Sequence, residues 1–90
     1  MNNDLELIYK FAQKHKIRFN FYDNFEDKVT SAWMVFYGED EYEIIFDYIY
    51  YQNFDRKRIQ IGFELKSELS VEDALKYYED LILLHKPVKM

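Results

Sequence analysis

The side chains that most often perform acid–base chemistry are few in this sequence. It has two histidines, His15 and His85, each close to the expected end of a helix, and it has no cysteine. The two histidines lack the local spacing of a metal site, and a chain without cysteine has no thiol catalysis and no disulfide. A histidine in such a position more often complements the helix dipole. We therefore expect no catalytic residue, no metal and no cofactor.

The serines and glycines lead to the same expectation. No nucleophile-elbow pattern surrounds Ser31, Ser67 or Ser70, and two glycines are too few to build a phosphate-binding loop. Ser70 is followed by Asp73 three residues later and by a helical apolar pattern, which is typical of a helix N-cap. The sequence therefore predicts a protein that is not an enzyme.

Carboxylates are abundant and unevenly distributed. The chain has 17 Asp and Glu against 12 Lys and Arg, for a net charge of −5. Residues 1–22 carry +2 and residues 56–90 carry +1, whereas residues 23–55 carry −8. This acidic balance argues against direct binding of nucleic acid. A concentrated acidic excess instead favours contact with a basic partner.

Apolar periodicity predicts the elements that position these groups. A helical spacing begins at Asn3 or Asp4, a period of two follows, and a second helical stripe begins after Ser70. Strands are expected over residues 17–22, 29–37, 41–51 and 59–65, between helices over 3–16 and 70–85. In the second strand either Trp33 and Val35 or Met34 and Phe36 face the core.

The order and the short connections predict one compact α+β domain over residues 1–90. Its sheet is a four-stranded antiparallel meander with both helices packed on one face, as a two-layer sandwich. No apolar run reaches the length of a membrane helix, and the first ten residues do not resemble a signal peptide. Residues with AT-rich codons dominate, which indicates an AT-rich bacterium or one of its phages. We expect a cytoplasmic location, in the bacterium or in the phage's bacterial host.

The phase of the third strand predicts a binding surface. Strict alternation turns Tyr42, Ile44, Phe46, Tyr48 and Tyr50 toward the core. Acidic and apolar residues then share the opposite face, and the acids are spaced like the phosphates of a nucleic acid. Mixed exposed patches of this kind usually mark contact sites. The predicted protein-binding residues are Glu39, Asp40, Glu41, Glu43, Ile45, Asp47, Ile49 and Tyr51.

This surface favours a small acidic inhibitor or antidote as the function. The expected partner is a protein with a basic, nucleic-acid-binding groove, such as a host defence nuclease inhibited by a phage protein. Direct contact with nucleic acid or a membrane is not expected. Two alternatives stay open: a structural or adaptor domain that forms a homodimer, and a small-molecule pocket lined by tyrosines such as Tyr48, Tyr77 and Tyr78.

Overall fold

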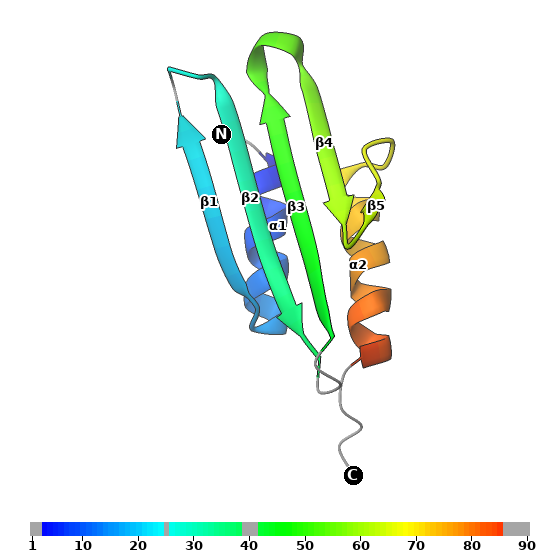
Figure 1. Cartoon of the computed structure of the whole chain (residues 1–90). Coiled ribbons are helices and arrows are strands. Elements are labelled where there is room, and N and C mark those ends of the chain that lie inside the picture. Colours follow the sequence, from blue (N-terminus) through cyan, green and yellow to red (C-terminus); the bar gives the residue numbers. More distant parts are fainter. Residues whose placement is uncertain (1–2, 25, 39–41, 86–90) are drawn as a thin grey trace.

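The computed structural model describes residues 3–24, 26–38 and 42–85 of the chain. Its strands form one open antiparallel sheet in which each strand pairs with its neighbour along the chain, in the order β1-β2-β3-β4-β5 (Figure 1). The elements are α1 (Asn3–His15), β1 (Arg18–Asn24), β2 (Val29–Tyr37), β3 (Glu43–Tyr51), the 3-10 turn η1 (Gln52–Phe54), β4 (Arg56–Ile61), β5 (Glu64–Leu65) and α2 (Val71–His85). The predicted α+β class and the antiparallel sheet are confirmed.

The sheet has five strands, so the prediction of four is wrong. The single strand expected over residues 59–65 is a tight hairpin, in which Ile61 of β4 pairs with Glu64 of β5. Gly62 lies between them at φ +58°, a conformation that glycine adopts without steric cost and that two-residue hairpins require. Phe63 is 100% exposed and Leu65 is 59% exposed. The apparent alternation of residues 59–65 therefore does not mark one buried face.

The predicted phase of β3 is confirmed from Ile44 onward, but the strand begins at Glu43, and the prediction that Tyr42 faces the core is wrong because Tyr42 precedes the strand and is 53% exposed. Ile44, Phe46 and Tyr48 are buried, whereas Ile45 is 43% exposed. The register places Met34 of β2 opposite Phe46, and Phe46 opposite Ile61 of β4. Directly opposed residues lie on the same face, so this register also assigns the faces of β2.

The core face of β2 carries Ala32 and Met34, both fully buried. Trp33 lies on the opposite face and is 39% exposed. Thr30 continues the core face toward the β1–β2 turn and is also buried. The ambiguity in the second strand is thus resolved in favour of Met34 and Phe36.

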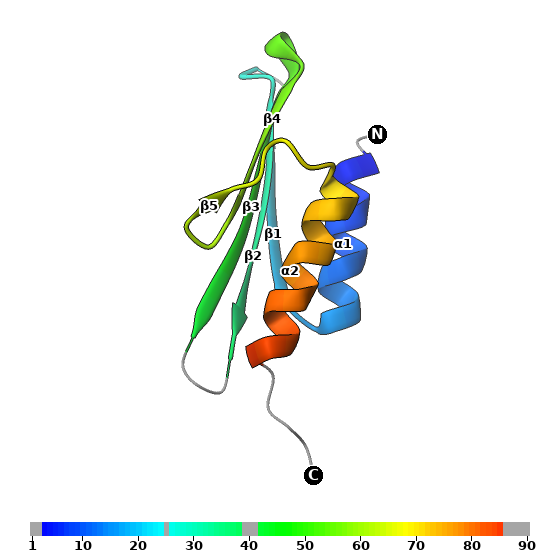
Figure 2. The same cartoon turned by 90° about the vertical axis from the view of Figure 1, so that its right-hand side faces the viewer.

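The helices supply the other layer of side chains around this core. Figure 2 shows α1 and α2 side by side on the same side of the sheet. From α1, Ile8 and Ala12 are buried, and α2 contributes Tyr78 and Ile82 among others. Neither helix, within the described ranges, is long and apolar enough to cross a membrane.

Two polar contacts fix α2. The Ser70 hydroxyl oxygen accepts the Asp73 amide at 3.1 Å, which confirms the predicted N-cap. The Tyr78 hydroxyl donates to the Ile44 carbonyl at 2.7 Å inside the core. Burial raises the pKa of Tyr78 far above its ordinary value, although a hydrogen bond with the Phe36 amide opposes this shift. The neutral phenol therefore links α2 to the β2–β3 pair.

Replacing Tyr78→Phe removes this buried donor and should lower the free energy of unfolding by about 1–3 kcal/mol. Urea titration measures the change. Tyr77→Phe is the matched control, because the Tyr77 hydroxyl donates to Glu64 at the exposed surface, and it should leave the midpoint almost unchanged. Equal effects of the two substitutions would contradict the role given to Tyr78.

Candidate functional site

An open groove lies where the first turns of α1 face the sheet. Its volume is about 1360 Å³. The lining combines aromatic rings with carboxylates, and no lysine or arginine of the described chain is part of it. The aromatic residues are Tyr9, Phe19, Phe21, Tyr48 and Tyr50, and the carboxylates are Asp4, Glu6, Asp23 and Asp55. We refer to it as the acidic groove.

The groove follows from the lengths of the elements. A helix of 13 residues such as α1 is about 20 Å long, whereas strands of nine residues such as β2 and β3 span about 30 Å. The C-terminus of α1 leads almost directly into β1, so the two run antiparallel from the same end (Figure 1). The helices therefore leave the opposite end of the sheet uncovered on their own side, as Figure 2 shows.

Aromatic rings form a continuous wall along the groove. The rings of Tyr9 and Phe19 meet edge to face at 5.5 Å between centroids. Phe19 and Phe21 stack at 6.0 Å, and Phe21 is 61% exposed. The wall thus extends from α1 onto the uncovered end of β1, where it presents ring faces to solvent.

Hydroxyl groups hold three of the four carboxylates in place. Tyr48 donates to Asp4 at 3.1 Å, Thr30 donates to Asp23 at 3.0 Å, and Tyr50 donates to Asp55 at 2.7 Å. A neutral hydroxyl orients a carboxylate without cancelling its charge. In the described part of the chain, neither Asp23 nor Asp55 forms an ion pair, whereas Glu6 pairs with Lys10 at 3.1 Å on the surface of α1.

The negative charge of these acids affects the pKa of Tyr50, which lies beside them. The pKa of Tyr50 is raised, first by its hydrogen bond to Asp55, then by desolvation and by the charges of Asp55 and Asp4. Two other bases, Arg56 and Lys57, line a smaller adjacent hollow that also contains Asp4 and Asp55. The ammonium group of Lys57 is directed to the Ser67 carbonyl at 3.2 Å. The groove therefore has a negative potential suited to a cation.

The structure places part of the predicted binding face together on the side of the sheet away from the helices. Glu43, Ile45, Asp47, Ile49 and Tyr51 alternate with the buried residues of β3, as the phase requires. The other predicted residues, Glu39, Asp40 and Glu41, lie outside the described residues. We refer to this side of the sheet as the open face.

The open face carries charges of both signs. Arg58 lies opposite Ile49, Arg56 lies opposite Tyr51, and Arg18 of β1 lies opposite Val35 of β2. Burial raises the pKa of Asp47, and the positive charge of Arg58 opposes that shift. The open face was expected to carry a row of negative charge. Arginines of the neighbouring strands lie beside these acids, so the face is mixed in sign.

The acidic groove was not predicted from the sequence, although two signals pointed to it. Asp23 is in phase with Phe19 and Phe21, and Tyr50 is in phase with the buried residues of β3. The length difference between strands and helices was the second signal. Of the three tyrosines named for a small-molecule pocket, Tyr48 reaches the groove, whereas Tyr77 and Tyr78 do not line it.

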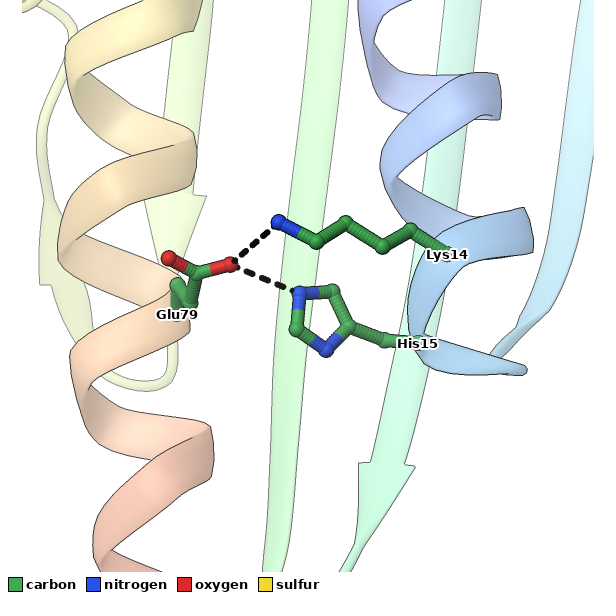
Figure 3. Close-up of polar contacts among 3 residues, drawn as sticks. All are labelled: Lys14, His15 and Glu79. Carbon is green, nitrogen blue, oxygen red and sulfur yellow. Dashed lines mark hydrogen bonds and ion pairs between the residues drawn. The ribbon is translucent and has the colours of Figure 1, made fainter.

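His15 belongs to a polar cluster between the helices. Its Nε2 lies 2.8 Å from Oε2 of Glu79, and the Lys14 ammonium lies 3.5 Å from the same oxygen (Figure 3). The His15 side chain is only 7% exposed, and its ring packs on Phe11 at 4.4 Å. The cluster joins the C-terminal end of α1 to α2, which is a structural role near a helix end.

Metal binding finds no support in the described residues, among which no group of three His, Asp or Glu side chains is placed to hold an ion. The second histidine, His85, stacks on Tyr42 with ring centroids 4.5 Å apart.

No protein-family model matches the chain, and no curated protein or solved structure shows significant similarity to it. The function must therefore be argued from the two surfaces themselves.

The Glu79 contact predicts a pH dependence of stability. The His15 hydrogen bond, followed by the charge of Lys14, lowers the pKa of Glu79 below its ordinary value of 4.5. A carboxylate with a lowered folded pKa stabilises the fold above its unfolded pKa, and this contribution is lost as the pH falls through the folded pKa. At neutral pH Glu79→Gln should therefore be less stable than the parent chain.

In acid the difference between Glu79→Gln and the parent should disappear, which urea titrations at about pH 7 and about pH 3 would measure. Asp80→Asn is the control on the same helix, because Asp80 is exposed, lies outside the first turn and forms no ion pair among the described residues, and it should change stability little at either pH. A Glu79→Gln deficit that persists in acid would contradict the assignment.

Proposed function

We propose that this chain is a small, acidic, non-enzymatic protein-binding module that docks on a basic surface of a partner through the acidic groove. In this role it acts as an inhibitor or antidote that occludes a nucleic-acid-binding groove, as a phage protein would inhibit a host defence nuclease. The observation that carries the proposal is the grouping of four carboxylates with exposed aromatic rings, in a groove lined by no described base.

The chemistry of the groove fits the side chains that line nucleic-acid-binding surfaces. Arginine and lysine dominate such surfaces because they contact phosphates. Asp23 and Asp55 offer charged acceptors, and the ring of Phe21 offers a face on which a guanidinium or ammonium group packs. A basic partner therefore satisfies both kinds of lining at once.

Electrostatics also favours rapid capture. The chain has a net charge of −5, and the cluster at the groove adds a directed field to this overall charge. Attraction between surfaces of opposite charge steers association and raises the rate at which the partners meet, and this effect is stronger at low ionic strength. An inhibitor that competes with nucleic acid for the same arginines gains from this steering.

We expect two substitutions in the acidic groove to weaken binding of the basic partner more than two substitutions on the open face. Asp23→Asn with Asp55→Asn keeps the shape of both acceptors, and asparagine tolerates the positive φ of residue 55. Capture of basic nucleic-acid-binding proteins from a bacterial lysate should fall on the order of tenfold per lost charged contact. Quantitative mass spectrometry of the captured proteins gives the measurement.

Glu43→Gln with Asp47→Asn is the matched control, since it changes the net charge equally but on the open face. The control should retain its partners, and raising the salt concentration should release them. Equal losses from the two double variants would show that only net charge matters. A larger loss from the control would move the site to the open face.

The open face supports a second candidate, self-association as a structural or adaptor domain. Trp33 and Ile45 are each about two-fifths exposed there, beside Val35, and charges of both signs flank them. A face with both signs can pair with a second copy of itself through a two-fold axis.

This candidate predicts a dimer at low micromolar concentration that Trp33→Ser dissociates into monomers, as measured by sedimentation velocity. Tyr37→Ser on the same strand is a suitable control, because it lies at the end of β2 and is highly exposed. A parent chain that sediments as a monomer at these concentrations removes the candidate.

A further inference from the structure

The free edge of β1 borders the acidic groove. β1 has seven residues, and among the described strands it pairs with β2 alone. It lies at the margin of the sheet, with no other element drawn beyond it (Figure 1). An uncovered edge of this length is a template for pairing with another extended chain.

The register shows which backbone groups of β1 point outward. The Gly38 amide donates to the Tyr42 carbonyl, and the Gln52 amide donates to the Lys28 carbonyl. In an antiparallel ladder the bonded pairs alternate, so the even-numbered residues of β2 bond to β3 and the odd-numbered ones bond to β1. Opposite those odd-numbered residues stand the even-numbered residues of β1. The amides and carbonyls of Phe19, Phe21 and Asp23 therefore point to the free edge.

The same three residues line the acidic groove with their side chains. Each thus presents an outward backbone donor and acceptor together with an aromatic or acidic side chain on the helix side. In a ladder, directly opposed residues point their side chains to the same face. A strand added to this edge would therefore direct every second side chain toward the groove.

We propose that the free edge of β1 receives an extended basic segment of a partner as an added antiparallel strand, with alternate arginine or lysine side chains entering the acidic groove. This inference rests on the proposed function and specifies how the partner binds. Main-chain hydrogen bonds to β1 supply affinity and the alternate side chains supply specificity, as in other strand-addition complexes.

Charge complementarity identifies the occupant. A basic residue opposite Asp23 meets a carboxylate, and one opposite Phe21 meets an exposed ring face. A second copy of this chain fits less well, because antiparallel self-pairing centred on Phe21 would place Asp23 opposite Phe19. No base would then enter the groove of either copy.

Backbone methylation of a model peptide tests this binding mode. The probe is the end-blocked peptide Arg-Thr-Arg-Thr-Arg-Thr-Arg, titrated into the full chain and followed by fluorescence anisotropy. In an antiparallel pairing, arginines that lie opposite Phe19, Phe21 and Asp23 enter the groove, and their amides also make the ladder bonds. N-methylation of those amides should weaken binding by about tenfold or more, and N-methylation of the threonine amides should weaken it by less than about threefold.

Amide hydrogen exchange gives an independent readout in the same complex. The amides of Phe19, Phe21 and Asp23 should exchange quickly in the free chain and become protected when the peptide binds. Those of Asn20 and Tyr22 should be protected in both states, because they bond to β2. Protection that does not change at the three outward amides would overturn the proposal.

Side-chain variants separate strand addition from charge attraction alone. Phe21→Thr removes the exposed ring on the groove side, whereas Tyr22→Thr makes a similar change on the open face of the same strand. Only Phe21→Thr should weaken the peptide, by about threefold or more. Equal effects of the two variants, or of the two methylated peptides, would overturn the strand-addition mode.

Other outcomes are equally decisive. A chain that does not bind the peptide, or that protects its outward amides by forming a dimer through β1, would overturn the inference. The proposed function has its own test, because selective loss of basic partners from the Asp23 and Asp55 double variant does not depend on how the backbone pairs.

Discussion

The central strands of the sheet are longer than the helices that cover them, and this difference in length organises the molecule. A nine-residue strand reaches about 10 Å beyond a 13-residue helix. Core residues such as Phe46 and Tyr48 lie under the helices, whereas the next core-phase residue, Tyr50, lies beyond full cover. The fold thus creates an aromatic surface at one end without any loss of packing in its centre.

At the end of the sheet that the helices leave uncovered, the carboxylates are not arranged to stabilise the fold by pairing with bases. Asp23 and Asp55 flank one groove without ion pairs among the described residues, and their hydroxyl partners orient them but leave their charges intact. Like charges near one another repel, and a bound cation would reduce that repulsion. In the first turns of α1, Asp4 and Glu6 additionally complement the helix dipole, so part of the acidic groove also stabilises the helix beside it.

Local periodicity predicted most of the fold and little of the acidic groove. The alternation in β3 correctly placed Ile45 outside, because one face of that strand is buried along nearly its whole length. The same rule failed at Gly62, where positive φ reverses the chain within an alternating run. The groove joins Asp4, Asp23 and Asp55, which are far apart in the sequence, so that only the register and the helix length bring them together. For the same reason, the charge of Arg58 on the open face could not be assigned before β4 was paired with β3.

The most direct test of the account is a map of the electrostatic potential at individual amides, obtained from paramagnetic relaxation by cationic and anionic nitroxide probes. With a negative potential in the acidic groove, the cationic probe should relax the amide protons of Phe21 and Asp23 more strongly than the anionic probe, and added salt should reduce the difference. At Val35 and Ile45, on the face with both signs, the two probes should differ much less. Equal relaxation by both probes at Phe21 and Asp23, or stronger relaxation by the anion, would contradict the account.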